Sequence, residues 1–305
     1  MYNLNFETYI LNECEVHLKL NHLDYYFHEI SKMLWPKFDQ IYKNTSEQIF
    51  KVNIKNTKLM VNGIHSVTHK LGEFLSMLNL ITKQTTATPM ILAKVKQIQT
   101  LYNQFFYELT ENYKFNSNYE REEIVTIFFI NNLYHLLVKL NDFDIIINEK
   151  DSESFSNILN NKRETYLNIL IKKYFEDMNR ILQIVISKND EIGKGKSPEI
   201  NGVPNEVSFI PTEVSKISKS ELKGISQHFT GKYRDIMNSV KKEINNSIKD
   251  NENAKLTYTK FLQELLNRYA SFIDLIRFSK NEDLLTSMVS VQKLMIEINN
   301  IMKGI

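Results

Sequence analysis

Apolar side chains recur three and four residues apart along most of the chain, which is the spacing of one face of an α-helix. The pattern is unbroken from Tyr258 to Ile276. It returns from Leu284 to Ile298, after Ser279 and Asn281, either of which can cap a helix. A third face runs from Phe229 to Ile248. Because short connections join these three segments, we expect them to pack as a bundle.

The same spacing predicts further helices upstream, and the longest covers residues 152–187. At 1.5 Å per residue this helix would span about 50 Å, which favours an elongated body over a compact globule. Other predicted helices cover residues 24–56, 58–83, 90–115 and 119–148, and strand signals are weak. The pattern therefore predicts an all-α fold, an elongated rod of stacked helical bundles.

The residues that break helices are concentrated in one place. The chain has 8 glycines and 5 prolines, and the segment 193–211 contains Gly193, Gly195, Pro198, Gly202, Pro204 and Pro211. This composition predicts a flexible polar loop at about 189–212. We place two domains at 1–116 and 117–305, because the last three helices alone would bury too little surface. The alternative boundary lies in the loop itself.

Composition and charge restrict the location and the partners. With 42% hydrophobic residues the chain has ample material for a core, and its net charge of +2 gives no field to attract nucleic acid or an anionic bilayer. The single cysteine, Cys14, has no partner for an internal disulfide, and the first residues do not form a signal peptide. No stretch approaches the roughly 20 apolar residues of a membrane span. We expect a cytosolic protein whose membrane association is peripheral.

One motif is similar to the end of a phosphate-binding loop, the tripeptide Gly195-Lys196-Ser197. The complete pattern needs another glycine five residues before the Gly-Lys pair, and Asp190 occupies that position. Pro198 follows where the helix of the motif should already have begun. The segment is therefore interpreted as a polar loop and not as a nucleotide site.

Other groups with possible chemistry also have simpler interpretations. His65 and His69 stand four residues apart and could face one metal ion, but no glutamate lies between them and no second cluster of ligands is recognisable. Acidic pairs and lysine groups are interpreted as solvated helix faces, and Cys14 as a packed residue. These pairs and groups are Glu122 with Glu123, Asp142 with Asp144, Lys241 with Lys242, and the lysines from Lys216 to Lys223. We expect no catalytic residue, cofactor or metal, and no enzymatic activity.

Four segments together carry a resemblance to a known family. They are LDYYFHEISKMLWPKFDQIYKNTSEQI from Leu23, LYHLLVKLNDFD from Leu133, FLQELLNRYASFIDLI from Phe261 and VSVQKLMIEINNIMK from Val289. In this order the chain resembles the vacuolar protein sorting protein 52 family over roughly residues 20–305. The six resemblance residues are Leu34, Trp35, Pro36, Phe38, Leu294 and Met295. By itself, the Trp35-Pro36 pair is interpreted as a core tryptophan beside a helix start or kink.

The resemblance implies a non-enzymatic subunit of the Golgi-associated retrograde protein complex, a tether for vesicles that travel from endosomes to the trans-Golgi network. The implied partners are vacuolar protein sorting proteins 51, 53 and 54, a Golgi Rab GTPase and SNAREs. The implied location is the cytosolic face of the trans-Golgi network and endosomes. The alternatives are an exocyst-type tether subunit and a generic helical scaffold or lipid-binding helical protein.

The chain differs from the family pattern in two respects. Its polar loop is longer, and the amino-terminal coiled coil through which such subunits assemble is absent. This is expected of a carboxy-terminal fragment or a shortened relative. The resemblance identifies no binding face and transfers no catalytic residue.

Overall fold

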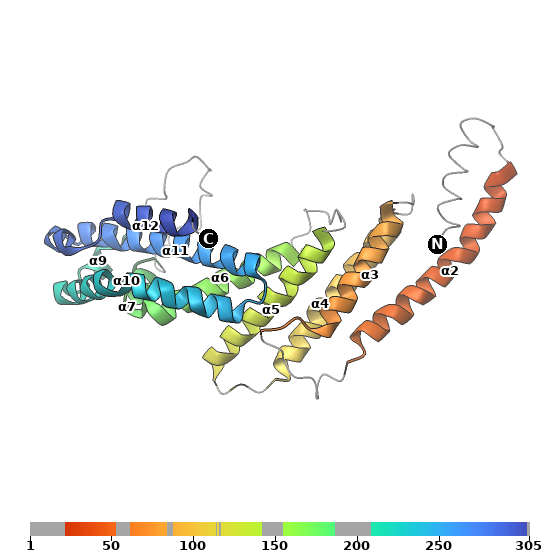
Figure 1. The fold of residues 1–305 in the computed structure, drawn as a ribbon, viewed down its shortest axis with the longest axis horizontal. Helices are drawn as coiled ribbons and strands as arrows, with labels where there is room; N and C mark the ends of the chain where they lie inside the picture. Colours follow the sequence, from red (N-terminus) through yellow and green to blue (C-terminus); the bar gives the residue numbers. More distant parts are fainter. Residues whose placement is uncertain are drawn as a thin grey trace. The chain divides into compact units, whose positions relative to one another are not determined.

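The computed structural model describes residues 22–52, 62–83, 88–113, 115, 117–141, 155–186 and 209–303. Within these ranges the regular elements are helices and there is no strand, which confirms the predicted all-α class (Figure 1). Contacts between helices divide the chain into two compact units, unit 1 at residues 1–160 and unit 2 at residues 161–305. None of the described helices is long and apolar enough to cross a membrane.

The described part of unit 1 contains four long helices. They are α2 (His22–Phe50), α3 (Ser66–Lys83), α4 (Thr88–Glu111) and α5 (Asn118–Asn141). Helix α3 packs on the other three, and α2 also packs on α4. At the centre, the Phe106 ring stands edge-to-face against Tyr102 and Phe128, with ring centroids 4.3 and 4.9 Å apart. Edge-to-face pairs of buried rings place the positive edge of one ring on the negative face of the other.

The division into units differs from the predicted domains 1–116 and 117–305. Helix α5 packs more extensively on α3 than any other pair of helices does, so it belongs to unit 1. The boundary between the units falls inside α6 (Phe155–Tyr174), between Asn160 and Asn161. The predicted boundary at residue 116 falls between α4 and α5 in the sequence, and both helices belong to unit 1.

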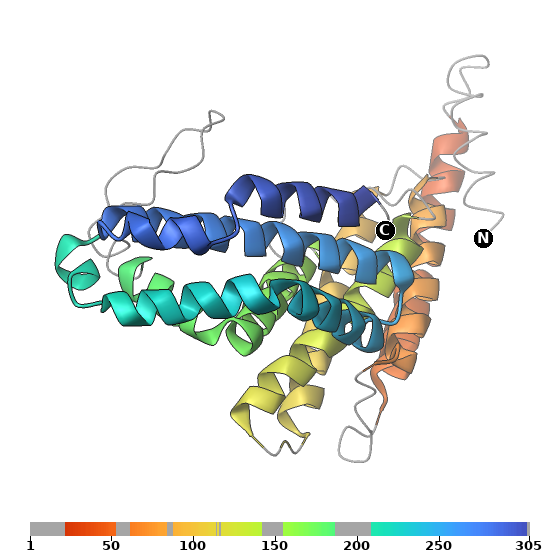
Figure 2. The ribbon, with the colours of Figure 1, turned by 60° about the vertical axis from the view of Figure 1, so that its left-hand side comes forward.

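Unit 2 is built around α11 (Asn251–Phe278). This helix packs on α7 (Glu176–Ile186), α10 (Lys219–Ser247), the 3-10 helix η2 (Glu282–Ser287) and α12 (Val291–Lys303). Figures 1 and 2 show α10, α11 and α12 side by side, with the short α9 (Pro211–Val214) near the start of α10. The Phe229 ring on α10 stacks on Tyr269 of α11 with centroids 4.0 Å apart, and it also contacts Phe175 at 5.5 Å.

Two helices begin earlier than their apolar spacing predicts, because polar side chains cap them. Ser218 precedes α10 and its side chain accepts a hydrogen bond from the Glu221 backbone N–H, so the Ser-x-x-Glu spacing of a capping box starts the helix well before Phe229. Asp250 precedes α11 and accepts from the Asn253 N–H at 2.9 Å. The polar residues between these helices therefore form a cap and a first turn.

Two predicted helices are interrupted. The helix predicted over 152–187 bends at Phe175, whose buried ring faces Phe229 in the core of unit 2. The helix predicted over 284–298 is divided into η2 and α12. The Tyr269 hydroxyl donates to the Val289 carbonyl at 2.6 Å, and the Ser290 hydroxyl accepts from the Lys293 N–H, so the backbone turns there and a new helix starts.

Several expectations concern residues outside the described ranges. These are the loop at 189–208, the tripeptide Gly195-Lys196-Ser197, the acidic pair Asp142 and Asp144, and Cys14. The end of the predicted loop is described, and Pro211 begins α9 there.

Candidate functional site

Four of the six resemblance residues lie near the middle of α2. Leu34, Trp35 and Phe38 are half-buried, and Trp35 stands edge-to-face against Phe38 with ring centroids 5.5 Å apart. Pro36 is exposed and lies inside the helix, where it lacks the N–H of an interior backbone hydrogen bond. Of the interpretation as a core tryptophan beside a helix start or kink, the helix start does not apply, since α2 begins at His22; Trp35 is half-buried, and the kink at Pro36 stays a prediction.

The second half of α2 holds the helix against unit 1. The Tyr42 hydroxyl donates to the Lys94 carbonyl of α4 at 2.7 Å, and the Lys94 ammonium pairs with Asp39 at 2.9 Å. The Tyr42 ring also lies 5.7 Å from Phe74 of α3. Burial raises the pKa of Tyr42 to about 12, so the hydroxyl keeps its proton and remains a donor. These contacts define the inward side of α2, together with buried Ile49.

A second apolar side of α2 remains open to solvent. Tyr26, Met33 and Ile41 are 59%, 65% and 63% exposed. Their spacing puts Tyr26 and Met33 on the side of the helix opposite Tyr42 and Ile49, and Ile41 at the border of that side. We call these three residues the outer face of α2. An isolated exposed apolar residue needs no explanation, but a row along one helix side is typical of a contact surface. This is the candidate interaction surface of unit 1.

The other two resemblance residues lie on α12. Leu294 is fully buried, whereas Met295 is 47% exposed beside Ile296, which is 58% exposed. Helix α12 is fixed to α10 by Glu297, whose carboxylate accepts hydrogen bonds from the Tyr233 hydroxyl at 2.8 Å and from Arg234 Nε at 3.0 Å. The hydrogen bonds from Arg234 lower the pKa of Glu297. Leu294 therefore has a packing role, and Met295 belongs to the surface.

A buried polar network joins three helices of unit 1. The Asn132 side-chain oxygen on α5 accepts from the His65 backbone N–H at 2.8 Å and from the Thr68 hydroxyl at 2.7 Å. The Asn132 amide donates to the Phe128 carbonyl at 2.9 Å. The Tyr102 hydroxyl of α4 lies 3.0 Å from the Thr68 hydroxyl and completes the network. Such a network fixes the register of the packed helices, because a displaced partner would leave a buried polar group unsatisfied.

The two histidines that could have shared a metal ion serve different purposes. His65 is buried, and its Nδ1 accepts a hydrogen bond from the Val67 N–H at 3.2 Å, so the ring caps the start of α3. His69 is exposed one turn later, and its Nδ1 lies 3.1 Å from His135 Nε2 on α5. The neighbour of His69 could not be found by sequence reasoning, because it is 66 residues away in the chain.

The cap formed by His65 predicts a pH dependence of folding. Burial lowers the pKa of His65, so the unfolded chain binds a proton more readily than the folded chain does. The stability that the neutral ring provides is therefore complete above the ordinary pKa of about 6.5 and decreases as the pH falls below it. The free energy of unfolding, measured with urea at pH 7.5, 6.5 and 5.5, should decrease toward acid in the parent chain. The decrease should be smaller in His65→Asn, because asparagine can still cap the helix but does not titrate.

The control for this prediction is His228→Asn, since His228 is exposed on α10. This variant should keep the pH slope of the parent chain. If His65→Asn also keeps the full slope, neutral His65 does not stabilise the fold.

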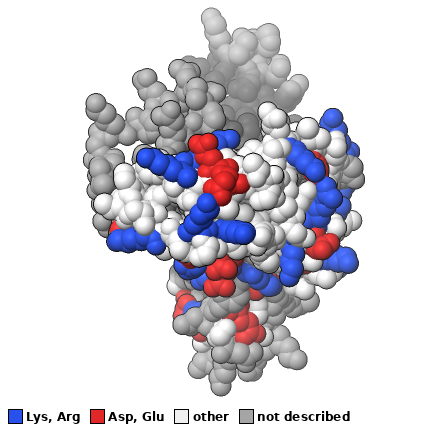
Figure 3. Space-filling model, turned by 90° about the vertical axis from the view of Figure 1, so that its left-hand side faces the viewer, with Lys and Arg blue, Asp and Glu red and all other residues white. Residues whose placement is uncertain are grey.

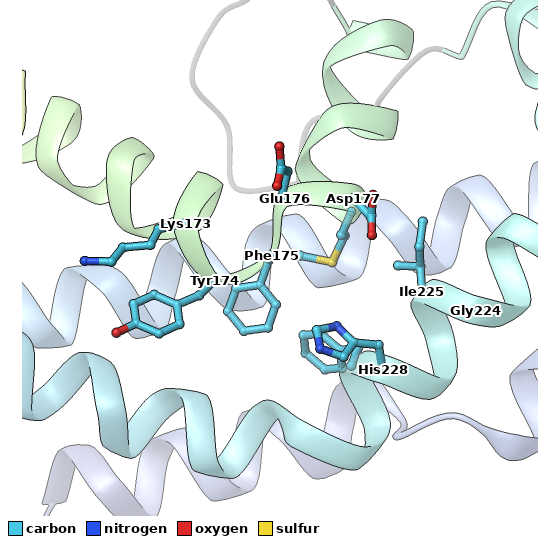
Figure 4. Close-up of a pocket in the computed structure, with 10 residues that line it drawn as sticks. Lys173, Tyr174, Phe175, Glu176, Asp177, Gly224, Ile225 and His228 are labelled. Atoms are coloured by element: carbon cyan, nitrogen blue, oxygen red, sulfur yellow. The ribbon is translucent and has the colours of Figure 1, made fainter. Parts of the chain in front are cut away.

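A cavity of about 270 Å³ lies at the bend between α6 and α7, and α10 forms its other wall. Figure 4 shows Phe175, Ile225 and His228 gathered around it, with Lys173 and Tyr174 extending away. The Lys173 ammonium and the Tyr174 hydroxyl both donate to the Glu243 carboxylate, each at 2.7 Å. Asp177 pairs with Arg180 at 3.4 Å, so three of the charged and polar residues that line the cavity are held by other residues of unit 2.

The charged surface of unit 2 mixes both signs. Lys216 pairs with Glu213 at 2.8 Å and Lys219 with Asp283 at 2.7 Å, which agrees with the interpretation of these lysines as a solvated face. Figure 3 shows Lys and Arg interspersed with Asp and Glu on the face that it presents. Lys242 and Glu122 are also exposed, and Lys241 and Glu123 are half-buried. Across the described residues, no group of three or more His, Cys, Asp or Glu could hold a metal ion.

The exposed helix surfaces are therefore the candidate functional features of the chain. Comparison with known families identifies its relatives. A scan against protein-family models matches the family described as Vps52, C-terminal, over residues 13–167. The chain belongs to the Vps52 family. The match covers half of the chain, includes α2 to α5, and contains Leu34, Trp35, Pro36 and Phe38. Leu294 and Met295 lie outside it, so the resemblance over the last 138 residues (305 minus 167) stays a prediction.

The Vps52 family supplies subunits of a multisubunit tethering complex that works peripherally at Golgi and endosomal membranes. A search of the curated proteins and a search of the solved structures returned no match. The Vps52 C-terminal region of this chain thus comprises the four helices of unit 1 and the start of α6, and the outer face of α2 lies within it.

Proposed function

We propose that the chain is a non-enzymatic subunit of the Golgi-associated retrograde protein tethering complex, acting in transport from endosomes to the trans-Golgi network. The match to the Vps52 family over residues 13–167 carries this proposal. The all-helical fold supports it, since stacked helices give a stiff body with many lateral faces for partners.

In this function the chain works by holding partners at fixed positions, and no covalent bond is formed or broken. The partners are vacuolar protein sorting proteins 51, 53 and 54, a Golgi Rab GTPase and SNAREs. The nearly balanced charge, with a net value of +2, makes membrane contact indirect or peripheral through these partners. The place of action is the cytosolic face of the trans-Golgi network and endosomes.

Affinity purification of the full chain from cells, followed by identification of stoichiometric partners, tests the proposal. We expect vacuolar protein sorting proteins 51, 53 and 54 to be recovered together. Recovery of plasma-membrane tether subunits would instead favour an exocyst-type subunit. Direct binding to anionic liposomes at physiological salt, with no sibling subunit recovered, would favour a lipid-binding helical protein.

The outer face of α2 is the surface on which we expect a sibling subunit to dock. Replacing both Met33 and Ile41 by glutamate places charge on side chains that are 65% and 63% exposed, so the fold should be retained. If a partner helix covers this face, desolvating the two new carboxylates should reduce recovery of sibling subunits by about tenfold or more. Quantitative recovery on the tagged chain, with circular dichroism to check folding, gives the measurement.

The chain offers a matched control of the same residue types. Replacing Met295 and Ile296 of α12 by glutamate makes the same chemical change at 47% and 58% exposed positions outside the family match. Recovery of sibling subunits should stay near that of the unmodified chain. If the α12 variant loses the sibling subunits and the α2 variant does not, the docking surface lies in unit 2.

A further inference from the structure

The most extensive helix contact in unit 1 is the seam between α3 and α5. Gly72 lies buried in this seam, and a Cβ placed there would be 3.5 Å from the Lys139 side chain of α5. One turn before Gly72, the Asn132 network ties His65 and Thr68 to the same helix. The two backbones are therefore held close together along several turns, and side chains at the edge of the seam have fixed positions relative to one another.

His69 and His135 face each other at this edge. The distance between His69 Nδ1 and His135 Nε2 is 3.1 Å, and the ring centroids are 4.5 Å apart with the ring planes at 72°. His69 is exposed and His135 is half-buried, so water and ions reach the pair. Each histidine is on a different helix, and each presents one ring nitrogen to the other.

This separation is close to what one zinc ion requires of two nitrogen ligands. With Zn–N bonds of 2.0–2.1 Å and tetrahedral angles, the two nitrogens stand about 3.3 Å apart. Each ring would turn to direct its lone pair at the metal and not at the other ring. Small rotations of this kind are accessible to an exposed histidine and to its half-buried neighbour at a seam edge.

We propose that His69 and His135 form a two-ligand Zn²⁺ site that joins α3 to α5. Imidazole nitrogen suits Zn²⁺, whereas Mg²⁺ and Ca²⁺ prefer oxygen ligands. His69 ligates through Nδ1 and His135 through Nε2, so the proton that joins them in the metal-free pair moves to the other nitrogen of one ring. No third His, Cys, Asp or Glu completes the set among the described residues, and the remaining positions are filled by water or by a partner's side chain.

The site would act as a clamp on the fold. The two ligands are 66 residues apart in sequence, so the unfolded chain does not present them together, and Zn²⁺ bound to the folded state stabilises it by mass action. Both rings must be neutral to bind, so the affinity decreases in acid. The two-ligand set makes binding weaker than in a closed four-ligand structural site, and the clamp responds to the free zinc level.

Thermal unfolding of the full chain with increasing ZnCl₂ tests the site. We expect the Tm to rise by about 2–4 °C at zinc concentrations well above the Kd, with a stoichiometry of one by calorimetry. MgCl₂ at the same concentrations should give no rise. In His69→Gln and in His135→Gln the zinc-dependent rise should be lost.

Two controls keep the test decisive. His28→Gln and His228→Gln remove exposed histidines elsewhere and should retain the full rise. If His69→Gln or His135→Gln is too unstable to compare, NMR of the unmodified chain during titration with ZnCl₂ gives the answer. The ring proton signals of His69 and His135 should shift at lower zinc concentrations than those of the other histidines. A rise that persists in His69→Gln and His135→Gln, or ring signals of other histidines that shift first, would overturn the proposal.

Discussion

Replacing Asn132 by leucine should lower the free energy of unfolding of unit 1 by about 3 kcal/mol, because two buried donors lose their acceptor. The Asn132 oxygen accepts from the His65 N–H at 2.8 Å and from the Thr68 hydroxyl at 2.7 Å, and both groups lie in the core. Leucine fills a similar volume, so the loss comes mainly from hydrogen bonding. Urea unfolding followed by circular dichroism measures the change.

The same substitution at Asn103 should cause no loss of stability. The buried side-chain oxygen of Asn103 on α4 accepts no hydrogen bond from any described residue. Leucine at this position removes an unsatisfied polar group and should leave the stability unchanged or raise it by up to about 1 kcal/mol. Equal losses of stability in Asn132→Leu and Asn103→Leu would mean that the hydrogen bonds of Asn132 do not hold the helices together.

Replacing Phe229 by alanine should cost unit 2 about 3–5 kcal/mol, the range for removing a large aromatic side chain from a packed core. Phe229 is 1% exposed, and its ring stacks on Tyr269 at 4.0 Å and on Tyr233 at 5.6 Å. The cavity that forms would lie where α10, α11 and the bend at Phe175 meet, so relaxation of one helix cannot fill it. Chemical unfolding of the full chain gives the measurement.

Phe278 provides the matched control on α11. Its ring is 45% exposed and contacts Phe209 at 5.5 Å, so alanine there removes little buried surface. The loss should be less than about 1 kcal/mol. A loss at Phe278 comparable to that at Phe229 would place the core of unit 2 elsewhere.

The fold class could be predicted from the sequence because helical periodicity is a local property. The spacing from Tyr258 to Ile276 indicates α11 without any knowledge of its neighbours, and the structure places these residues in one helix. The early start of α10 also has a local signal, the Ser218 and Glu221 capping box, which the spacing analysis did not use.

The interruptions could not be predicted in this way, since tertiary contacts cause them. The break before α12 depends on the Tyr269 hydroxyl, which reaches the Val289 carbonyl from another helix. The bend at Phe175 depends on the position of Phe229 on α10. The periodicity of one segment contains no information on side chains that contact it from other helices, so it predicts a continuous helix for both segments.

The candidate surfaces were only partly visible in the sequence. Trp35 and Pro36 marked the family, but Trp35 lies on the inward side of α2, seven residues before Tyr42, and neither residue belongs to the outer face. The outer face emerged once Tyr42 and Ile49 were known to point inward. The pairing of His69 with His135 required the packing of α5 on α3, which local sequence cannot supply.

The central claim is that the chain functions as a tether subunit in transport from endosomes to the trans-Golgi network. The most direct test follows a cargo protein that cycles between these compartments in cells depleted of the chain. We predict that the cargo accumulates in endosomes, and that the unmodified chain restores its return while the variant with glutamate at Met33 and Ile41 does not. Normal return of the cargo in depleted cells, with secretion to the plasma membrane impaired instead, would contradict the account.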